Sequence, residues 1–204
     1  LLQVSLIQGE AKTEKIKIKN VGNTRIVIKV ETFDLEEFVL LHEENLTLNI
    51  GETKEIEINF ISLPQTPPAI YVGKIIFTSG SFRESIASVI EVNPKKALFD
   101  INLEVPPLYK TVSPGKKISV LIDMINIGLK GTAVDVDLTL YVTDLDKSVF
   151  YESSHEVLAV EDDLSISRKI QLPPNIPDGE YLVLGQLTYS NVTIETYDLF
   201  RVKK

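Results

Sequence analysis

The chain has 204 residues, no cysteine and a formal net charge of -8 at pH 7. Without cysteine it can contain no disulfide, no thiolate zinc ligand and no cysteine nucleophile. Its acidic balance argues against a nucleic-acid binder and against docking on an anionic membrane surface, because both need a basic face. The hydrophobic share of 44% and the charged share of 25% are typical of a globular protein.

The first half of the chain predicts short strands separated by turns. Strands are expected at 2–7, 14–20, 24–33, 46–50, 54–61, 70–78 and 82–92. In the second of these, Ile16 and Ile18 alternate with lysines, which predicts one buried face and one solvated face. Residues 34–44 are ambiguous and are expected to form a strand or an irregular segment. Three prolines within 63–68 predict a loop, because proline cannot lie in a central strand.

The second half continues in the same way. Strands are expected at 97–105, 117–126, 132–143, 148–151, 156–160, 165–172, 180–190 and 193–202. In the strand 132–143, alternation places Asp135, Asp137 and Thr139 on the outward face. The short polar segment 93–96, which contains Pro94, predicts a semi-rigid linker between an N-terminal domain, 1–93, and a C-terminal domain, 97–204.

An internal repeat accompanies this pattern. An offset of 106 residues aligns Asn20 with Asn126 and Gly22 with Gly128. Asn and Gly tolerate a positive φ, so each Asn-x-Gly predicts a tight turn that joins the strands on either side into a hairpin. The repeat and the regular turn spacing predict an all-β fold of two tandem immunoglobulin-like β-sandwich domains, with about seven to eight strands each.

The order of Pro-Gly, alternating strand, Asn-x-Gly and second alternating strand resembles the immunoglobulin-like modules of CARDB and NEW3 type in prokaryotic, especially archaeal, cell-surface proteins. Those modules also carry a Pro-x-Gly-x-Tyr segment before the last hairpin, found here from Pro177 to Tyr181. The first domain has Pro67 and Tyr71 at these places but lacks the glycine. The resemblance implies a surface-exposed, often membrane-anchored protein of several modules, and it brings no catalytic residues.

Acidic residues at predicted turns are the candidates for a metal site. Asp144 and Asp146 flank one turn, and Asp162 and Asp163 lie on another. Calcium prefers several carboxylate oxygens that converge on turns. The sequence has no Asp-x-Asp-x-Asp-Gly loop, however, and solvated turns are the alternative interpretation of the same residues.

The remaining motifs predict little chemistry. Asn45 and Asn191 begin acceptor sequons for N-glycosylation. His42 and His155 are the two histidines, one in each domain, and are expected on the surface. The sequence has no Gly-x-Ser-x-Gly nucleophile elbow, and it calls for neither a catalytic residue nor a cofactor.

These observations predict a non-enzymatic structural, scaffolding or adhesion module, and the resemblance implies that it is part of a cell-envelope protein, outside the cytoplasm. Its partners would be other envelope proteins or other domains of the same chain. No run approaches the roughly 20 apolar residues of a membrane helix, so any membrane attachment would come from an anchor outside this sequence. The alternative is a glycan- or calcium-binding accessory module of a larger surface protein or enzyme, with aromatics such as Tyr141, Tyr181 and Tyr189 as a surface for sugar rings.

Overall fold

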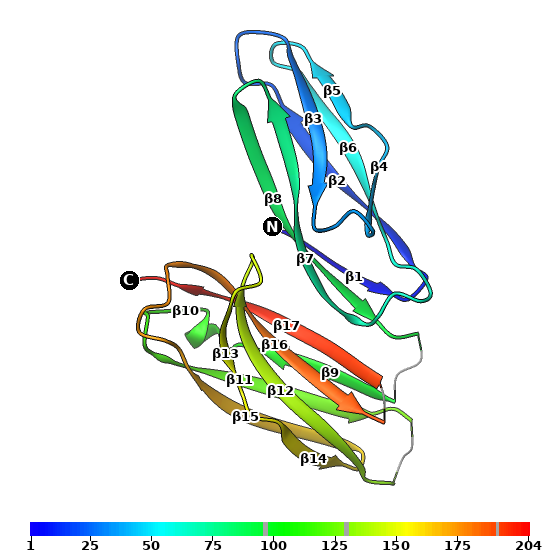
Figure 1. Ribbon diagram of the computed structural model, residues 1–204, viewed down its shortest axis with the longest axis vertical. Coiled ribbons are helices and arrows are strands. Elements are labelled where there is room, and N and C mark those ends of the chain that lie inside the picture. Colours follow the sequence, from blue (N-terminus) through cyan, green and yellow to red (C-terminus); the bar gives the residue numbers. More distant parts are fainter. Residues whose placement is uncertain (96–97, 129–130, 191) are drawn as a thin grey trace. The chain divides into compact units, whose positions relative to one another are not determined.

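The computed structural model describes residues 1–95, 98–128, 131–190 and 192–204, and its secondary structure is almost entirely β-strand (Figure 1). Among these residues the one helical element is a short 3-10 turn, Pro107–Tyr109. None of the described helices is long and apolar enough to cross a membrane. The predicted all-β class is therefore confirmed. The chain divides into two compact units, with Leu1–Pro67 and Tyr71–Val92 in unit 1 and Pro68–Ile70 and Asn93–Lys204 in unit 2.

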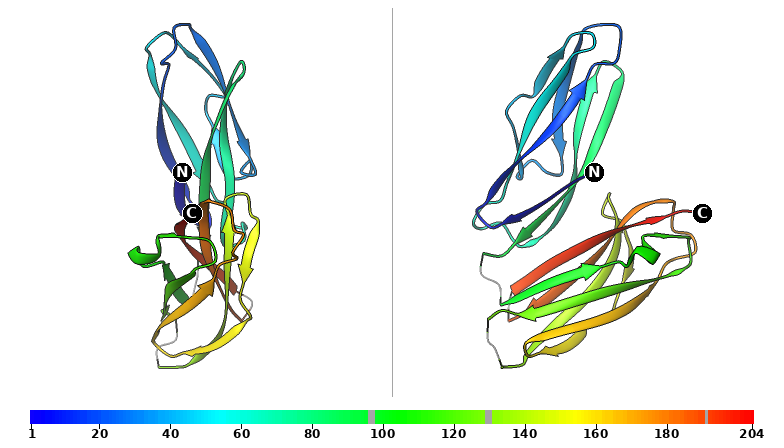
Figure 2. Two further views of the ribbon diagram at one scale, coloured as in Figure 1. Left: turned by 90° about the vertical axis from the view of Figure 1, so that its left-hand side faces the viewer. Right: turned by 180° about the vertical axis from the view of Figure 1, so that it is seen from behind.

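Unit 1 is built from two sheets. One has the strand order β1-β8-β7-β3-β5, and the other has the order β2-β6-β4. The bounds are β1 Leu2–Ile7, β2 Ala11–Lys19, β3 Ile26–Phe33, β4 Val39–Leu41, β5 Asn45–Leu48, β6 Thr53–Ile61, β7 Ala69–Ser79 and β8 Phe82–Asn93. Their inward side chains form one core, which includes Leu6, Ile58, Phe60, Ile75 and Ile90. Figure 2 shows the two layers edge on in its left view.

Unit 2 also has two sheets around a core of its own. One has the order β10-β17-β16-β12-β13, with β14 also paired to β12, and the other has the order β15-β11-β9. The bounds are β9 Phe99–Glu104, β10 Thr111–Val112, β11 Lys117–Asn126, β12 Val134–Asp144, β13 Val149–Glu152, β14 Glu156–Val160, β15 Asp163–Gln171, β16 Gly179–Tyr189 and β17 Val192–Val202. The core includes Phe99, Ile118, Ile122, Met124 and Val142.

The prediction that each Asn-x-Gly segment joins its two flanking strands into a hairpin is wrong. In unit 1, β2 pairs with β6, whereas β3 pairs with β5 and β7 in the other sheet. In unit 2, β11 pairs with β9 and β15, whereas β12 pairs with β13, β14 and β16. Each Asn-x-Gly therefore begins a crossover between sheets. Alternation fixes which side chains face the core, but two strands can share a core without sharing a sheet.

The outward face of β12 also differs from the prediction at one residue. Asp135 is exposed and Asp137 is partly exposed, but Thr139 is only 2% exposed. His155, in the connection between β13 and β14, lies against it, with its Nδ1 atom 3.3 Å from the Thr139 hydroxyl. A segment that folds back over a strand changes the exposure of that strand without changing its alternation.

Candidate functional site

A buried asparagine closes the crossover between the sheets of unit 1. Asn20 is 2% exposed. Its side-chain nitrogen donates to the carbonyl oxygens of Thr24, Leu48 and Asn49 at 2.8, 3.2 and 3.0 Å. Its side-chain oxygen accepts a hydrogen bond from the Gly22 N–H at 3.0 Å. One side chain thus ties the crossover to the turn after β5.

The same arrangement occurs in unit 2. Asn126 is 4% exposed, and its side-chain nitrogen donates to the carbonyls of Glu161 at 3.0 Å and Thr132 at 3.4 Å. Its side-chain oxygen accepts from the Gly128 N–H at 3.1 Å. Neither Gly22 nor Gly128 has a positive φ. The prediction that these glycines are needed for a positive φ in a tight turn is therefore wrong. At Gly128 the reason for glycine is steric, because a Cβ atom there would lie 2.3 Å from a methyl carbon of Leu98.

A buried or half-buried tyrosine fixes the loop before the last hairpin in both units. The hydroxyl of Tyr71 donates to the Pro67 carbonyl, and that of Tyr181 donates to the Pro177 carbonyl, each at 2.8 Å. A tyrosine hydroxyl bonded to backbone a few residues upstream is a known corner of immunoglobulin-like sandwiches. Burial, and then nearby carboxylates, raise the pKa of Tyr181, so its hydroxyl stays a donor at neutral pH. The bond forms in unit 1 without the glycine of the Pro-x-Gly-x-Tyr segment.

The predicted metal candidates Asp144 and Asp146 lie in the turn between β12 and β13. The Oδ1 atom of Asp144 accepts hydrogen bonds from the backbone N–H groups of Asp146 at 2.9 Å and Ser148 at 2.8 Å. Asp144 thus stabilises its own turn, which is a common use of an aspartate side chain at such a position.

The other two candidates lie at the opposite end of β12. Asp162 accepts a hydrogen bond from the Gly131 N–H at 3.2 Å, and Asp163 begins β15. Together with Asp123 they line a shallow hollow of about 530 Å³. The length of β12 separates this hollow from Asp144 by about 30 Å. Within the described ranges, no group of three or more His, Asp or Glu side chains is arranged to hold a metal ion.

The histidines lie on separate units. The Nδ1 atom of His155 is 3.2 Å from a carboxylate oxygen of Asp137 and 3.3 Å from the Thr139 hydroxyl. The Nε2 atom of His42 is 2.7 Å from the side-chain nitrogen of Asn59. Of the two predicted sequons, Asn45 is exposed at the start of β5, whereas Asn191 lies outside the described residues.

Two of the three tyrosines predicted as a surface for sugar rings lie inside the protein. Tyr181 and Tyr189 are buried. The Tyr181 ring packs edge-on against Phe150, with a centroid distance of 5.3 Å, and the Tyr189 ring packs against Phe99 at 4.8 Å. These two rings belong to the core and present no face to a sugar in solution.

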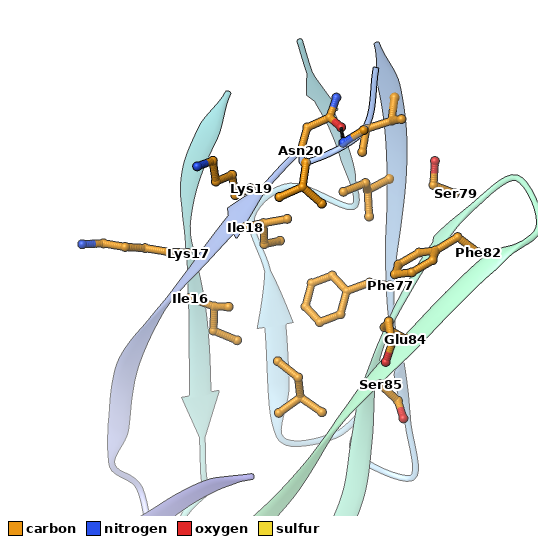
Figure 3. A pocket seen from close by; sticks show the side chains of 15 residues that line it. Ile16, Lys17, Ile18, Lys19, Asn20, Phe77, Ser79, Phe82, Glu84 and Ser85 are labelled. Carbon is orange, nitrogen blue, oxygen red and sulfur yellow. Dashed lines mark hydrogen bonds between the residues drawn. The ribbon is translucent and has the colours of Figure 1, made fainter. Parts of the chain in front are cut away.

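An apolar groove of about 520 Å³ opens in unit 1 between β2 and the hairpin of β7 and β8 (Figure 3). Ile16 and Ile18 of β2 and Phe77 of β7 point into it, while Lys17 and Lys19 point away from it. Ile16 and Ile18 are only half-buried. Phe82 also lines the groove and is 58% exposed. Alternation predicted the inward direction of the two isoleucines, but it did not predict that they line an open groove.

Lysines follow the outer face of β2 beside this groove. The Lys15 ammonium lies 3.2 Å from a carboxylate oxygen of Glu55 and 3.2 Å from one of Glu57, both on β6. The hydrogen bond to Glu55 is the largest cause of a raised Lys15 pKa, so this side chain stays charged. Lys17 and Lys19 extend the same basic row along the strand.

An ion pair joins the two sheets of unit 2 between β14 and β15. Arg168 donates from Nε to one Glu156 oxygen at 2.8 Å and from Nη2 to the other. The hydrogen bond from Arg168 lowers the pKa of Glu156. Because the folded pKa lies below the unfolded value of about 4.3, the pair stabilises the fold fully above that pH and loses this effect as the pH falls through the folded pKa.

Replacing Glu156 with glutamine is therefore expected to flatten the acid limb of the stability curve of unit 2. Both side chains are about one third exposed (34% and 38%), so the difference at neutral pH should be below about 1 kcal/mol. Urea unfolding at several pH values between about 3 and 7 measures it. Glu180→Gln, at an exposed position on β16, is the matched control. An unchanged acid limb in Glu156→Gln would show that the pair has no such role.

No family model matches the chain, and no curated protein matches it. Among solved structures, a protein of unknown function from Porphyromonas gingivalis W83 is similar with a TM-score of 0.52 and 10% identity, over 97% of this chain and 92% of that one. The CupB2 chaperone of Pseudomonas aeruginosa aligns with a TM-score of 0.36 and 8% identity, over 97% and 96%. The sporulation control protein Spo0M of Bacillus subtilis aligns with a TM-score of 0.40 and 12% identity, over 53% and 51%. The first of these similarities concerns the fold alone.

Proposed function

We propose that the two units are tandem immunoglobulin-like β-sandwiches that serve as a non-enzymatic structural, scaffolding or adhesion part of a cell-envelope protein. The observation that carries the proposal is the recurrence of two structural devices. Each unit has a buried asparagine at the crossover, Asn20 or Asn126, and a tyrosine bonded to a proline carbonyl, Tyr71 or Tyr181. Both devices hold the ends of a sandwich rather than a substrate.

The strand pairings support the view that one module occurs twice. In each unit the long strand that leads up to the asparagine, or ends on it, pairs with a later strand, β2 with β6 and β11 with β15. The strand after the crossover pairs with the first strand of the last hairpin, β3 with β7 and β12 with β16. A chain that repeats one rigid module is suited to spacing and presenting binding surfaces.

In this role the mechanism is geometric. Each unit has its own core between two sheets, and the packing of that core sets its shape. Interaction with other envelope proteins, or with other domains of the same polypeptide, would use loops and strand edges. Attachment to the membrane would come from an anchor outside these residues.

Proteolysis of intact cells tests the proposed location. The chain, detected by an antibody against unit 2, is expected to be cleaved when protease is added to intact cells of the source organism. A cytoplasmic protein followed in the same samples should stay intact until the cells are lysed, which is the control for cell integrity. Protection of the chain on intact cells, with cleavage only after lysis, would contradict a surface role.

A further inference from the structure

Unit 2 shows which element lies beside the strand that corresponds to β2. There, β9 pairs antiparallel with β11, with Phe99 opposite Asn126, Ile101 opposite Met124 and Leu103 opposite Ile122. The side chains of Phe99, Ile101 and Leu103 are all buried in the core. On this side of unit 2 the sandwich is therefore closed by a strand with an apolar residue at every second position.

Unit 1 has no such strand in the part of the chain that the structure describes. The offset of 106 residues places Ile16 at the position of Ile122 and Ile18 at the position of Met124. Ile122 and Met124 are fully buried, whereas Ile16 and Ile18 are half-buried and line the groove. In its sheet, β2 is the end strand.

The first strand of unit 1 does not take the place of β9. β1 lies in the other sheet, where it pairs with β8. At the same offset it corresponds to β10, which pairs with β17, the last strand of unit 2. On one side of β2, the Asn20 N–H donates to the Glu52 carbonyl, and the backbone groups of Ile16 and Ile18 face β6 in the same alternation. The backbone groups of Lys15, Lys17 and Lys19 therefore point to the other side, which is an open edge beside an apolar groove. An added strand satisfies this combination.

We propose that this groove binds an extended strand of another polypeptide, which pairs antiparallel with β2 and closes the sandwich as β9 does in unit 2. The bound strand would place three alternate apolar side chains into the groove, against Ile16, Ile18 and Phe77. Main-chain hydrogen bonds to β2 would supply affinity, and the groove would select the apolar positions.

The lysines of β2 predict which residues the outward face of the bound strand carries. In the register of β9 on β11, the outward residues Glu104, Asn102 and Asp100 lie opposite positions 121, 123 and 125. The corresponding residues of β2 are Lys15, Lys17 and Lys19. Opposite charges in directly paired positions stabilise a sheet, so the partner should carry acidic residues between its apolar ones. The predicted ligand is thus a strand of alternating apolar and acidic residues.

A synthetic peptide with the sequence of residues 98–105, Leu-Phe-Asp-Ile-Asn-Leu-Glu-Val, is the probe. We expect saturable binding to the 204-residue chain by fluorescence anisotropy, and slower hydrogen exchange of the backbone amides of Lys15, Lys17 and Lys19, which face the open edge. A scrambled peptide of the same composition, which breaks the alternation, is expected to bind at least about tenfold more weakly. Equal binding of the two peptides, or protection elsewhere in the chain, would overturn the proposal.

Variants locate the binding. Ile18→Asp and Phe82→Asp each place a carboxylate in the groove and are expected to weaken peptide binding at least about tenfold. Phe82 is largely exposed, so its variant keeps the test valid if Ile18→Asp unfolds unit 1. Leu40→Asp, at a 54% exposed position on β4 of the same unit, is the matched control and should bind normally. Normal binding by Phe82→Asp and Ile18→Asp would exclude the groove.

Other occupants give different results. If the amides of Lys15, Lys17 and Lys19, which face the open edge, are already protected without peptide, the edge is filled by a second copy or by the same polypeptide, and a separate partner is excluded. The proposed function supplies only the expectation that a partner exists, and the binding of an alternating strand at β2 rests on it for that alone. Failure of peptide binding would leave the surface location untouched, and protection from protease on intact cells would leave the peptide result untouched.

Discussion

Phe60→Ala is expected to lower the free energy of unfolding of unit 1 by about 3–5 kcal/mol, the largest effect of any substitution considered. Phe60 is fully buried on β6, where it lies opposite Val39 of β4. Removing the ring leaves a cavity between the two sheets as well as losing apolar burial. Because unit 2 has a separate core, its unfolding should not change.

Urea unfolding followed by hydrogen exchange in each unit separates the two transitions. The control is Phe82→Ala, because this exposed side chain contributes little to the core and should change stability by less than about 0.5 kcal/mol. If Phe60→Ala shifts the unfolding of both units equally, the chain unfolds as one cooperative body. That result would count against two independent sandwich modules.

Asn20→Ala is expected to destabilise unit 1 by about 2–4 kcal/mol. The two N–H groups of this amide are shared among three backbone carbonyls, and its oxygen accepts one further N–H. Each such bond contributes about 1 kcal/mol, and partners left unsatisfied inside the protein add to the cost. The loss should appear as a lower urea midpoint for unit 1.

Asn23→Ala is the control for this prediction, since Asn23 lies three residues away on the same crossover and is exposed. Asn126→Ala should also destabilise unit 2, where the amide bonds to the carbonyls of Glu161 and Thr132 and to the Gly128 N–H. If the alanine variants at positions 20 and 126 are as stable as the control, the asparagines are not structural anchors, and the device that supports the repeated-module proposal has no energetic basis.

The strands themselves could be predicted from sequence because their signal is local. Ile56, Ile58 and Phe60 alternate with polar residues, and all three are buried on β6 as expected. The loop at 63–68 and the hairpin of β16 and β17 follow from prolines and from turn residues in the same way. Each of these features depends on residues within a few positions of one another.

The candidate site could be predicted only in part. The local sequence marks Asn20 and Gly22 only as a turn, because the long-range partners of the Asn20 side chain, Leu48 and Asn49, leave no mark on it. The sequence also indicates the acidic turns, but only the folded chain shows that Asp144 and Asp162 lie at opposite ends of β12. The 106-residue offset also places Ile18 at the position of Met124, but the sequence gives no sign that Met124 is fully buried while Ile18 lines an open groove.

Sequence by itself determined the all-β class, the position of most strands, the direction of their side chains and the absence of thiol chemistry. Tertiary structure alone decided which strands share a sheet, why each Asn-x-Gly is there, and that β2 ends its sheet beside an open groove. The physical reason is that alternation is set by the backbone of one strand, with a period of two. Pairing instead depends on where distant segments meet, and the same alternation suits an edge strand and a covered strand equally well.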